Sequence, residues 1–429
     1  MNRILICNGH IVDPANQVDS IQNLLICGGK IAQIGERIEV EADRVIDAEG
    51  LIVTPGLIDM HVHLREPGFE HKETIKSGTR AAAAGGFTSV ACMANTQPVA
   101  DSPEVIRFIR SQAEKSGVAN VFPIGSITKN LTGEEVTDVP ALLEAGAVAL
   151  SDDGKTVMNA ALMREVLAWS AQLGFPVAVH CEEHNLNAGT VMNLGETSNR
   201  LNLPGSPNAA EDIIAARDIM LAELTGGHLH VLHVSTAGTV ELVRWGKRRG
   251  VHVTAEATPH HFTLTEAAVE EHGANAKMHP PLRTEADVRA VVDGLIDGTL
   301  DAIATDHAPH APFEKAQGMD DAPPGIVGSE TCVPLVFTKL IGSGRLRLSE
   351  AIAKMTCTPA KILNIDRGTL SIGAAADVTL IDPKREVKVD PAQFESKGRN
   401  TPFRGWALRS CPVMTIRGGE VTHSVLNDG

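Results

Sequence analysis

Two histidines separated by a single residue, His61 and His63, form the first pattern in the sequence with the chemistry of a metal site. Alternate residues of a β-strand point to the same face, so both imidazoles could reach one ion if residues 57–64 form a strand. The pattern alone also fits two ordinary strand histidines. Its interpretation as a ligand pair therefore depends on companions elsewhere in the chain.

Further candidate ligands stand in or at the ends of other short apolar runs: Asp153, His180, His233 and Asp306. Four histidines and two aspartates suit Zn²⁺, and six ligands exceed what one tetrahedral zinc needs. Two ions that share Asp153 as a bridge fit this set. A water between them would become a hydroxide nucleophile near neutral pH, and Asp306 beside it could act as the catalytic proton shuttle.

The alternation of side chains along a strand does not settle which histidine of the run 228–235 is the ligand. His228 and His230 share one face of their strand, and His233 lies on the other face unless a bulge intervenes. We choose His233 because it lies nearer the C-terminal end, and we expect the other two to be structural. Roles in supporting the site also stay open for three residues: Asp59, His260 and His261.

The elements that must position these residues alternate between strand-like apolar runs and helical segments. This alternation predicts an α/β protein with a parallel sheet. Eight βα units indicate a TIM (β/α)8 barrel, whose active site lies at the C-terminal strand ends. The eight runs are 57–64, 87–95, 120–127, 147–153, 176–182, 228–235, 252–261 and 301–310.

Both ends of the chain read instead as short strands broken by Gly, Asn and Asp. We expect residues 1–54 and 366–429 to form one small β-sandwich domain together, with the barrel occupying 55–365. Residues 311–329 form a long connection directly after the eighth run, rich in Pro and Gly and without a clear period. Loops of this kind are often lids, although a tolerated surface insertion stays open.

Composition excludes several classes of function. The 429 residues carry 38 Lys and Arg against 53 Asp and Glu, a net charge of −15. Such an excess of acid argues against binding to nucleic acid or to an anionic membrane. No apolar run reaches membrane-helix length, and no signal peptide is recognisable. The seven cysteines form no C-x-x-C pair, which favours free thiols in a reducing cytoplasm.

Several motifs together resemble the amidohydrolase superfamily, and specifically dihydroorotase of the bacterial class I type. The resemblance covers nearly the whole chain. It implies the reversible cyclisation of N-carbamoyl-L-aspartate to L-dihydroorotate in de novo pyrimidine (UMP) biosynthesis, with zinc as cofactor, a homodimer, and association with aspartate transcarbamoylase. The motifs are PGLIDMHVHLREPG, MANTQP, SDDGKTV, VHCEE, LHVST, the PPLR of KMHPPLR, and ATDHAPH.

The resemblance also implies individual roles. His61 and His63 would hold one metal with Asp306, His180 and His233 would hold the second, and Asp153 would bridge them. The implied substrate contacts are His63, Arg65, Asn95, His279, His310, Pro324 and Gly325.

Two of these positions depart from the family pattern. His279 stands where Asn usually precedes PPLR, and Pro324 stands where Phe usually precedes Gly.

Three alternatives accompany this reading. Lys155, rather than Asp153, could be the bridging group after carbamylation, as in hydantoinases. The chain could be another cyclic amidohydrolase, of the hydantoinase or allantoinase kind. It could also be a non-catalytic scaffold for aspartate transcarbamoylase, although such scaffolds have lost metal ligands and this chain keeps all six.

Overall fold

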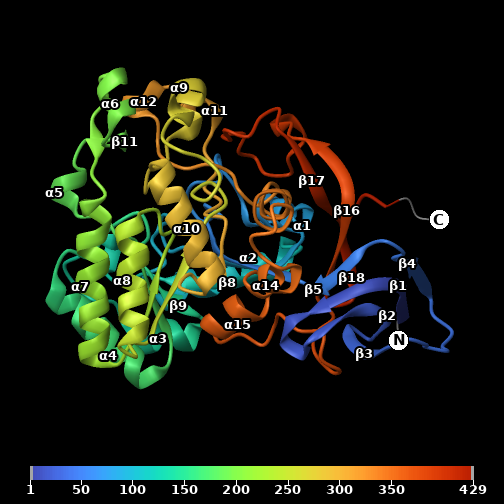
Figure 1. The fold of residues 1–429 in the computed structure, drawn as a ribbon. Coiled ribbons are helices and arrows are strands. Elements are labelled where there is room, and N and C mark those ends of the chain that lie inside the picture. Colours follow the sequence, from blue (N-terminus) through green and yellow to red (C-terminus); the bar gives the residue numbers. More distant parts are fainter. Residues whose placement is uncertain (1–2, 427–429) are drawn as a thin grey trace.

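The computed structural model describes residues 3–426, which form two large β-sheets with helices around one of them (Figure 1). The chain starts in one sheet, runs through the helical part, and returns to the first sheet at its C-terminal end. Within the described residues, none of the helices is both long and apolar enough to cross a membrane.

The sheet inside the helical part is the predicted barrel. Its strands all pair in parallel, and each pairs with the next one along the chain. A bridge between Val62 and His307, with the His63 N–H donating to the His307 carbonyl at 2.8 Å, joins the last strand to the first. The strands are β6 (Leu57–Val62), β7 (Phe87–Cys92), β8 (Asn120–Gly125), β9 (Ala149–Leu150), β10 (Pro176–Val179), β13 (His228–Val231), β14 (Val253–Ala257) and β15 (Ala302–Ile303).

Helices cover the outside of the barrel, and the sequence marks where several begin. Thr74 caps α1 through a capping box with Ser77, and Thr284 caps α10 in the same way with Asp287. The helices that follow the eight barrel strands are α1 (Ile75–Ala84), α2 (Pro103–Ser116), α3 (Val139–Ala145), α4 (Ala160–Leu173), α7 (Ala209–Thr225), α8 (Ala237–Arg248), α10 (Glu285–Asp297) and α13 (Cys332–Val336).

Shorter elements lie in the connections. They are α5 (His184–Asn187), β11 (Met192–Asn193), α6 (Glu196–Leu201), β12 (Gly205–Ser206), α9 (Ala268–His272), α11 (Pro312–Lys315), α12 (Gly318–Asp321), α14 (Leu348–Ala353) and α15 (Cys357–Ile362).

The barrel interior is lined by small apolar side chains beneath the candidate ligands. Ala178, Ala302 and Ala304 are all buried in this inner cluster, with Met60 and Met93. Small side chains at this level leave space above them, at the C-terminal strand ends, which is where the sequence predicts the metal site.

The second sheet combines the two ends of the chain, drawn blue and red in Figure 1. Strand β16 pairs antiparallel with β5, and buried side chains from both ends of the chain, such as Ile6 and Leu380, share one core. The strands are β1 (Arg3–Asp13), β2 (Val18–Cys27), β3 (Lys30–Gly35), β4 (Arg44–Asp47), β5 (Ile52–Pro55), β16 (Val378–Lys388), β17 (Ala407–Arg417) and β18 (Glu420–Ser424). The predicted fold class, a TIM barrel with a β domain made by both termini, is confirmed.

The connection between β16 and β17 leaves this sheet and packs on the barrel. Val389 and Phe403 share a buried cluster with Ile326 and Leu335, and the Phe403 ring meets Trp406 edge to face at 5.2 Å. Residues distant in sequence thus meet near the C-terminal strand ends.

The connection 311–329 is not structureless as expected, because it contains α11 and α12. The side chain of Glu314 accepts from the Ala311 N–H at 2.8 Å, which closes the first turn. The Lys315 ammonium is buried and donates to the carbonyls of Pro323 at 2.9 Å and Gly325 at 3.0 Å. This cross-link organises a segment that shows no period in its sequence.

Candidate metal centre

Asp153 lies between two pairs of histidines. One carboxylate oxygen, Oδ2, is 3.6 Å from His61 Nε2 and 3.3 Å from His63 Nε2. The other, Oδ1, is 3.5 Å from both His180 Nδ1 and His233 Nε2. All five side chains are buried. A carboxylate that turns each oxygen to a different ligand pair has the arrangement of a bridging ligand.

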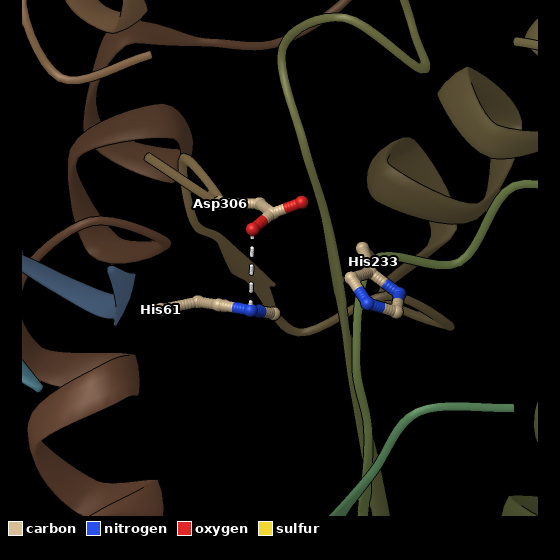
Figure 2. A group of neighbouring side chains, drawn as sticks. All are labelled: His61, His233 and Asp306. Atoms are coloured by element: carbon tan, nitrogen blue, oxygen red, sulfur yellow. Dashed lines mark ion pairs between the residues drawn. The ribbon is translucent and has the colours of Figure 1, made fainter. Parts of the chain in front are cut away.

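Asp306 completes the group on the side of the first pair. Its Oδ1 lies 3.0 Å from His63 Nε2 and 3.4 Å from His61 Nε2. Figure 2 shows the contact with His61, with His233 facing the same space from another strand end. Three ligand sets within the described residues have donor atoms no more than 4.8 Å apart, and together they use His61, His63, Asp153, His180, His233 and Asp306.

The structure resolves the parity question for His233. Strand β13 ends at Val231, so strict alternation no longer applies two residues later, and His233 turns inward with a positive φ of 32°. Asp306 follows β15 in the same way, with φ 47°. Non-glycine residues in this region cost about 1–3 kcal/mol each, and such strain concentrates at functional sites. His230 instead bonds Thr254 and Glu256, as expected for a structural residue.

Buried partners orient the candidate ligands. Glu256 Oε1 lies 2.7 Å from His61 Nδ1, Glu182 Oε2 lies 2.8 Å from His180 Nε2, and Asn95 Oδ1 lies 2.9 Å from His63 Nδ1. Partners of this kind fix the tautomer and ring orientation of metal-binding histidines. Glu256 and Glu182 are not among the candidate site residues that the sequence predicts. For Glu256 the available signal was a glutamate inside a strand of otherwise apolar or small residues, because buried carboxylates are nearly always paired. Glu182 follows the end of β10 and carried no such signal.

Electrostatics shows how closely these charges are coupled. Burial acts to raise the pKa of Glu256, but the neighbouring His61 and His230 lower it to about 2. Burial acts to lower the pKa of His180, but Asp153 and Glu182 raise it to about 10. Nearby histidines thus hold the buried Glu256 carboxylate deprotonated, and nearby carboxylates favour the charged form of His180.

Two buried polar atoms in the centre of this group fit a metal ion. His61 Nε2 and Asp153 Oδ1 have no hydrogen-bond partner within the part of the chain that the structure describes. Both face the other candidate ligands, so their lone pairs remain available to a cation. A donor set of imidazole nitrogens and carboxylate oxygens is the set that zinc prefers.

A cavity of about 220 Å³ opens beside this centre. All seven residues expected to contact substrate lie in its wall, together with several candidate ligands. The lining residues are His63, Arg65, Asn95, Asp153, Gly154, His180, His233, His279, Asp306, Ala308, His310, Pro324 and Gly325.

Arg65 turns its half-buried guanidinium toward this cavity. Its Nε donates to the Pro309 carbonyl at 3.3 Å, and its Nη2 lies 3.4 Å from His310 Nε2. Burial lowers its pKa to about 10, so the group stays charged at neutral pH. Within the described residues Arg65 forms no ion pair with the nearby Glu66 or Glu70, whose carboxylates accept from backbone N–H groups instead.

The other wall residues are held by local contacts. His310 Nε2 donates to the Pro324 carbonyl at 2.8 Å, and burial, with Arg65 nearby, lowers the pKa of this histidine to about 2. The side chain of His279 is 26% exposed, and its Nδ1 lies 3.6 Å from Glu182 Oε2. His310 is therefore neutral, and His279 reaches the second ligand pair through a carboxylate.

The residues left open in sequence take supporting positions. Asp59 accepts from both the N–H and the hydroxyl of Thr305, next to Asp306. His261 is held by Thr258 and the Pro280 carbonyl, and His260 is buried. Lys155 is exposed in the turn after Asp153 and does not line the cavity, so its side chain is not placed as a bridge.

Comparison with known proteins agrees with this geometry. A family model described as Dihydro-orotase-like matches residues 50–239. A dihydroorotase of Pelotomaculum thermopropionicum is 54% identical over 419 residues, covering 98% of each chain. The chain belongs to the dihydroorotase family. A second family member, from Syntrophus aciditrophicus, is 49% identical and covers 98% of this chain and 99% of its own.

Solved structures extend the likeness beyond the dihydroorotase family. An L-hydantoinase (dihydropyrimidinase) from Arthrobacter aurescens has a TM-score of 0.89 at 26% identity, covering 99% of this chain and 96% of its own. A D-hydantoinase has a TM-score of 0.87 at 26% identity, with coverages of 98% and 95%. The barrel and the terminal β domain are thus shared with structures that are much less similar in sequence.

Proposed function

We propose that this chain is a dihydroorotase of the bacterial class I type, which interconverts N-carbamoyl-L-aspartate and L-dihydroorotate in de novo pyrimidine biosynthesis in the cytoplasm. The observation that carries the proposal is the full-length relative named dihydroorotase at 54% identity. The class I type is supported by Asp153, whose two carboxylate oxygens face the two histidine pairs. The family resemblance implies a carbamylated lysine at this position in hydantoinases.

We assign two zinc ions to the centre. His61, His63 and Asp306 would hold the first, His180 and His233 the second, and Asp153 both. When bound, zinc would polarise the ring carbonyl and lower the pKa of the attacking water. The donor set and the unpartnered His61 Nε2 support this assignment.

Asp306 is assigned the proton transfer. Ring opening needs one proton taken from the attacking water and one delivered to the leaving nitrogen. The Asp306 carboxylate lines the cavity, and its Oδ1 faces His63 at 3.0 Å. Burial acts to raise the pKa of Asp306, but His61 and His63 more than offset it and hold the group ionised. It therefore starts the cycle as a proton acceptor.

The cavity wall is assigned the recognition of an anionic substrate. The Arg65 guanidinium has no carboxylate partner among the described residues, and its planar fork suits the substrate carboxylate. The Asn95 amide is assigned a second contact with this carboxylate. His310, Pro324 and Gly325 line the cavity from the connection that follows β15. His279 lines it from the connection that follows β14.

We also propose the division of the chain that the sequence predicts. The boundary between 1–54 and 55–365 falls at the last residue of β5, just before β6 starts, and β16 starts after the boundary at 365. The β domain would then be two separate segments of chain around one continuous barrel.

A metal-quantified assay in both directions tests the function. We expect bound zinc and turnover of both carbamoyl aspartate and dihydroorotate, in preference to hydantoin and allantoin. Preference for the other cyclic ureides would favour a hydantoinase activity, the activity named for the similar solved structures. A metal-free protein without turnover would favour a scaffold.

Asp306→Asn tests the proton transfer within the same assay. The variant should keep its fold and lose turnover by a factor on the order of 10² or more. Asp218→Asn is a matched control, since Asp218 is also buried but pairs with Arg217 and does not line the cavity. Near-normal turnover in the Asp306 variant would remove this residue from the mechanism.

A further inference from the structure

The amide of Asn400 joins the two loops that form one wall of the cavity. Its Nδ2 donates to the Ala308 carbonyl at 3.0 Å and to the Gly325 carbonyl at 2.9 Å. Its Oδ1 accepts from the His310 N–H at 3.1 Å. The residue is buried, and its own carbonyl accepts from the Val327 N–H at 2.9 Å. One side chain therefore fixes the backbone on both sides of the wall.

Asn400 does not belong to the barrel. It lies in the connection between β16 and β17, two strands of the β domain, and is 90 residues away from His310 in sequence. The wall of the cavity is thus supported by a segment outside the barrel that does not itself line the cavity.

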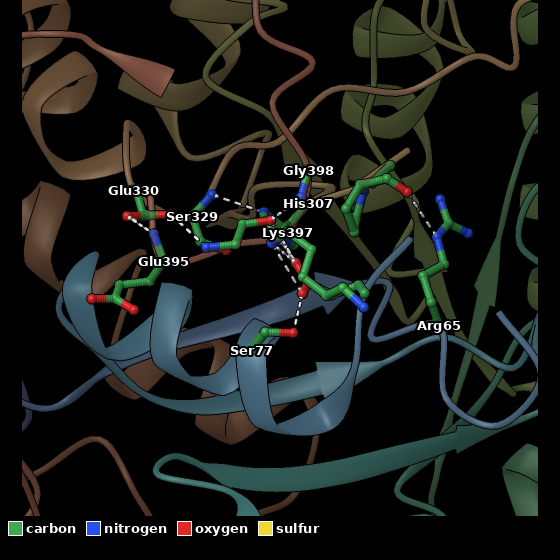
Figure 3. A network of polar contacts seen from close by, with 12 residues as sticks. Arg65, Ser77, His307, Ser329, Glu330, Glu395, Lys397 and Gly398 are labelled. Carbon is green, nitrogen blue, oxygen red and sulfur yellow. Dashed lines mark hydrogen bonds and ion pairs between the residues drawn. The ribbon is translucent and has the colours of Figure 1, made fainter. Parts of the chain in front are cut away.

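The same segment has a second attachment a few residues earlier. The Ser396 hydroxyl and the Lys397 N–H donate to the buried carboxylate of Glu73, whose Oε2 lies 3.5 Å from His307 Nε2. Figure 3 shows Lys397 and Gly398 beside His307, with Ser77 pointing to the same place from α1. Because His307 follows Asp306 directly, the segment is fastened to the end of β15 at two points.

The backbone of the wall has little room to shift or to carry a side chain at Gly325. Gly325 has a φ of 128°, which strongly favours glycine, and a Cβ there would lie 2.7 Å from the Ala308 Cβ and 3.1 Å from His310 Nε2. Loss of the Asn400 amide would remove the donor that the buried Ala308 carbonyl has from this side chain and would leave the Gly325 carbonyl with the Lys315 ammonium alone. The loops would rearrange to satisfy these groups. A displacement of about 1 Å at positioning groups can cost as much as 10²-fold in rate.

We propose that Asn400 is a positioning residue for substrate binding, which holds His310 and the Gly325 backbone in place. This inference rests on the proposed function, because it assigns the wall to the binding of the anionic substrate. Among the described residues, Asn400 contacts none of the candidate metal ligands, and its side chain bonds the backbone of the loop that follows β15.

Steady-state kinetics with dihydroorotate provides the test, using Asn400→Ala and Asn400→Asp. Aspartate keeps the shape and the acceptor for the His310 N–H, but it turns a carboxylate oxygen toward two carbonyls. Both variants should raise KM about tenfold while kcat stays within about threefold and zinc content is unchanged. If the alanine variant does not fold, the aspartate variant decides the question by the same constants.

Asn120→Ala is the matched control. Asn120 also joins the barrel to the β domain, since its amide donates to the Thr88 carbonyl at 3.1 Å, to Ser89 at 3.2 Å and to Asp377 at 3.0 Å. It begins β8, at the end of the barrel away from the cavity. This variant should lower the melting temperature and leave KM unchanged.

A double-mutant cycle with His310→Ala separates positioning from a merely structural role. If Asn400 acts through His310, the KM increases should be less than multiplicative. Multiplicative effects, or a parental KM in both Asn400 variants, would overturn the inference. A parent enzyme that does not turn over dihydroorotate would overturn the proposed function instead, so the two failures are distinguishable.

Discussion

The two histidine pairs beside Asp153 are built in different ways. His61 lies in β6 and His63 directly follows its last residue, with the His63 N–H still bonded to the His307 carbonyl at 2.8 Å. The alternation of the strand therefore turns both rings to the same face. His180 and His233 lie just beyond the ends of two neighbouring strands, and their rings meet edge to face at 4.8 Å. The first pair is a local feature of the chain, and the second exists only in the folded barrel.

The carboxylates that support the two pairs differ in how many partners hold them. Glu256 contacts the His61 ring, the His230 ring at 3.2 Å and the His233 N–H at 3.3 Å. Glu182 contacts one ligand, and its Oε1 is buried without a partner among the described residues. We expect the pair that one strand presents, whose His61 ring meets a carboxylate held by further partners, to hold its metal more firmly than the pair presented by two separate strand ends.

The strongest challenge to this comparison is Asp153→Asn, which affects both pairs at once. The amide keeps the size of the side chain but removes the bridging charge. Turnover should fall by more than about 10²-fold, the upper end of effects seen when only a supporting residue is lost. Zinc content should also fall. Retention of two zinc ions per chain would contradict the bridging role.

Glu256→Gln should weaken the first pair most. The buried His61 ring would lose its carboxylate partner, and metal affinity should fall by about 10–100-fold. Competition with a chelator, followed by metal analysis, measures this directly. Glu266→Gln is the control, because Glu266 is also buried but contacts Asn193 and the Thr197 N–H, away from the ligands.

Glu182→Gln should have a smaller effect, confined to the second pair. Since only His180 loses a partner, we expect about a tenfold loss of metal affinity. In the parent protein a chelator should remove the metal at His180 and His233 before the one at His61 and His63. Simultaneous loss of both metals would show that the two pairs are equally firm, contrary to the comparison.

His279→Asn should have the smallest effect and depend on pH. Burial lowers the pKa of His279 below its usual value near 6.5, so the ring is neutral at pH 8 and gains charge only as the pH falls through that lowered value. At pH 8 KM for dihydroorotate should change by less than about threefold. Toward acid pH the parent gains a cation beside the anionic substrate, and the KM ratio of variant to parent should rise. A constant ratio would contradict this role.

The sequence predicts the parts of the site that depend on local geometry. His61 and His63 follow from strand alternation, and the barrel follows from eight apolar runs. Alternation could not select His233, because β13 ends at Val231 before reaching it. Glu256 stood within a predicted strand, yet one sequence does not tell which buried carboxylate reaches a ligand on a distant strand.

Long-range contacts were the least predictable. Nothing near Asn400 indicates that its amide meets loops 75 and 92 residues earlier in the chain. The helices α11 and α12 were missed for a related reason. Their order depends on Lys315, which donates to several backbone carbonyls of neighbouring segments, and such contacts leave no periodic pattern.

The edge-to-face pair of Phe403 and Trp406 gives the protein a built-in optical probe. The chain has three tryptophans and no tyrosine, so its intrinsic emission comes from tryptophan alone. Trp169 and Trp245 lie on the outer helices α4 and α8, whereas Trp406 follows the segment of Asn400 and carries the Lys339 ammonium 5.2 Å above its ring. With Trp169 and Trp245 replaced by phenylalanine, the remaining fluorescence would report on the connection between β16 and β17, whose Asn400 supports the cavity wall.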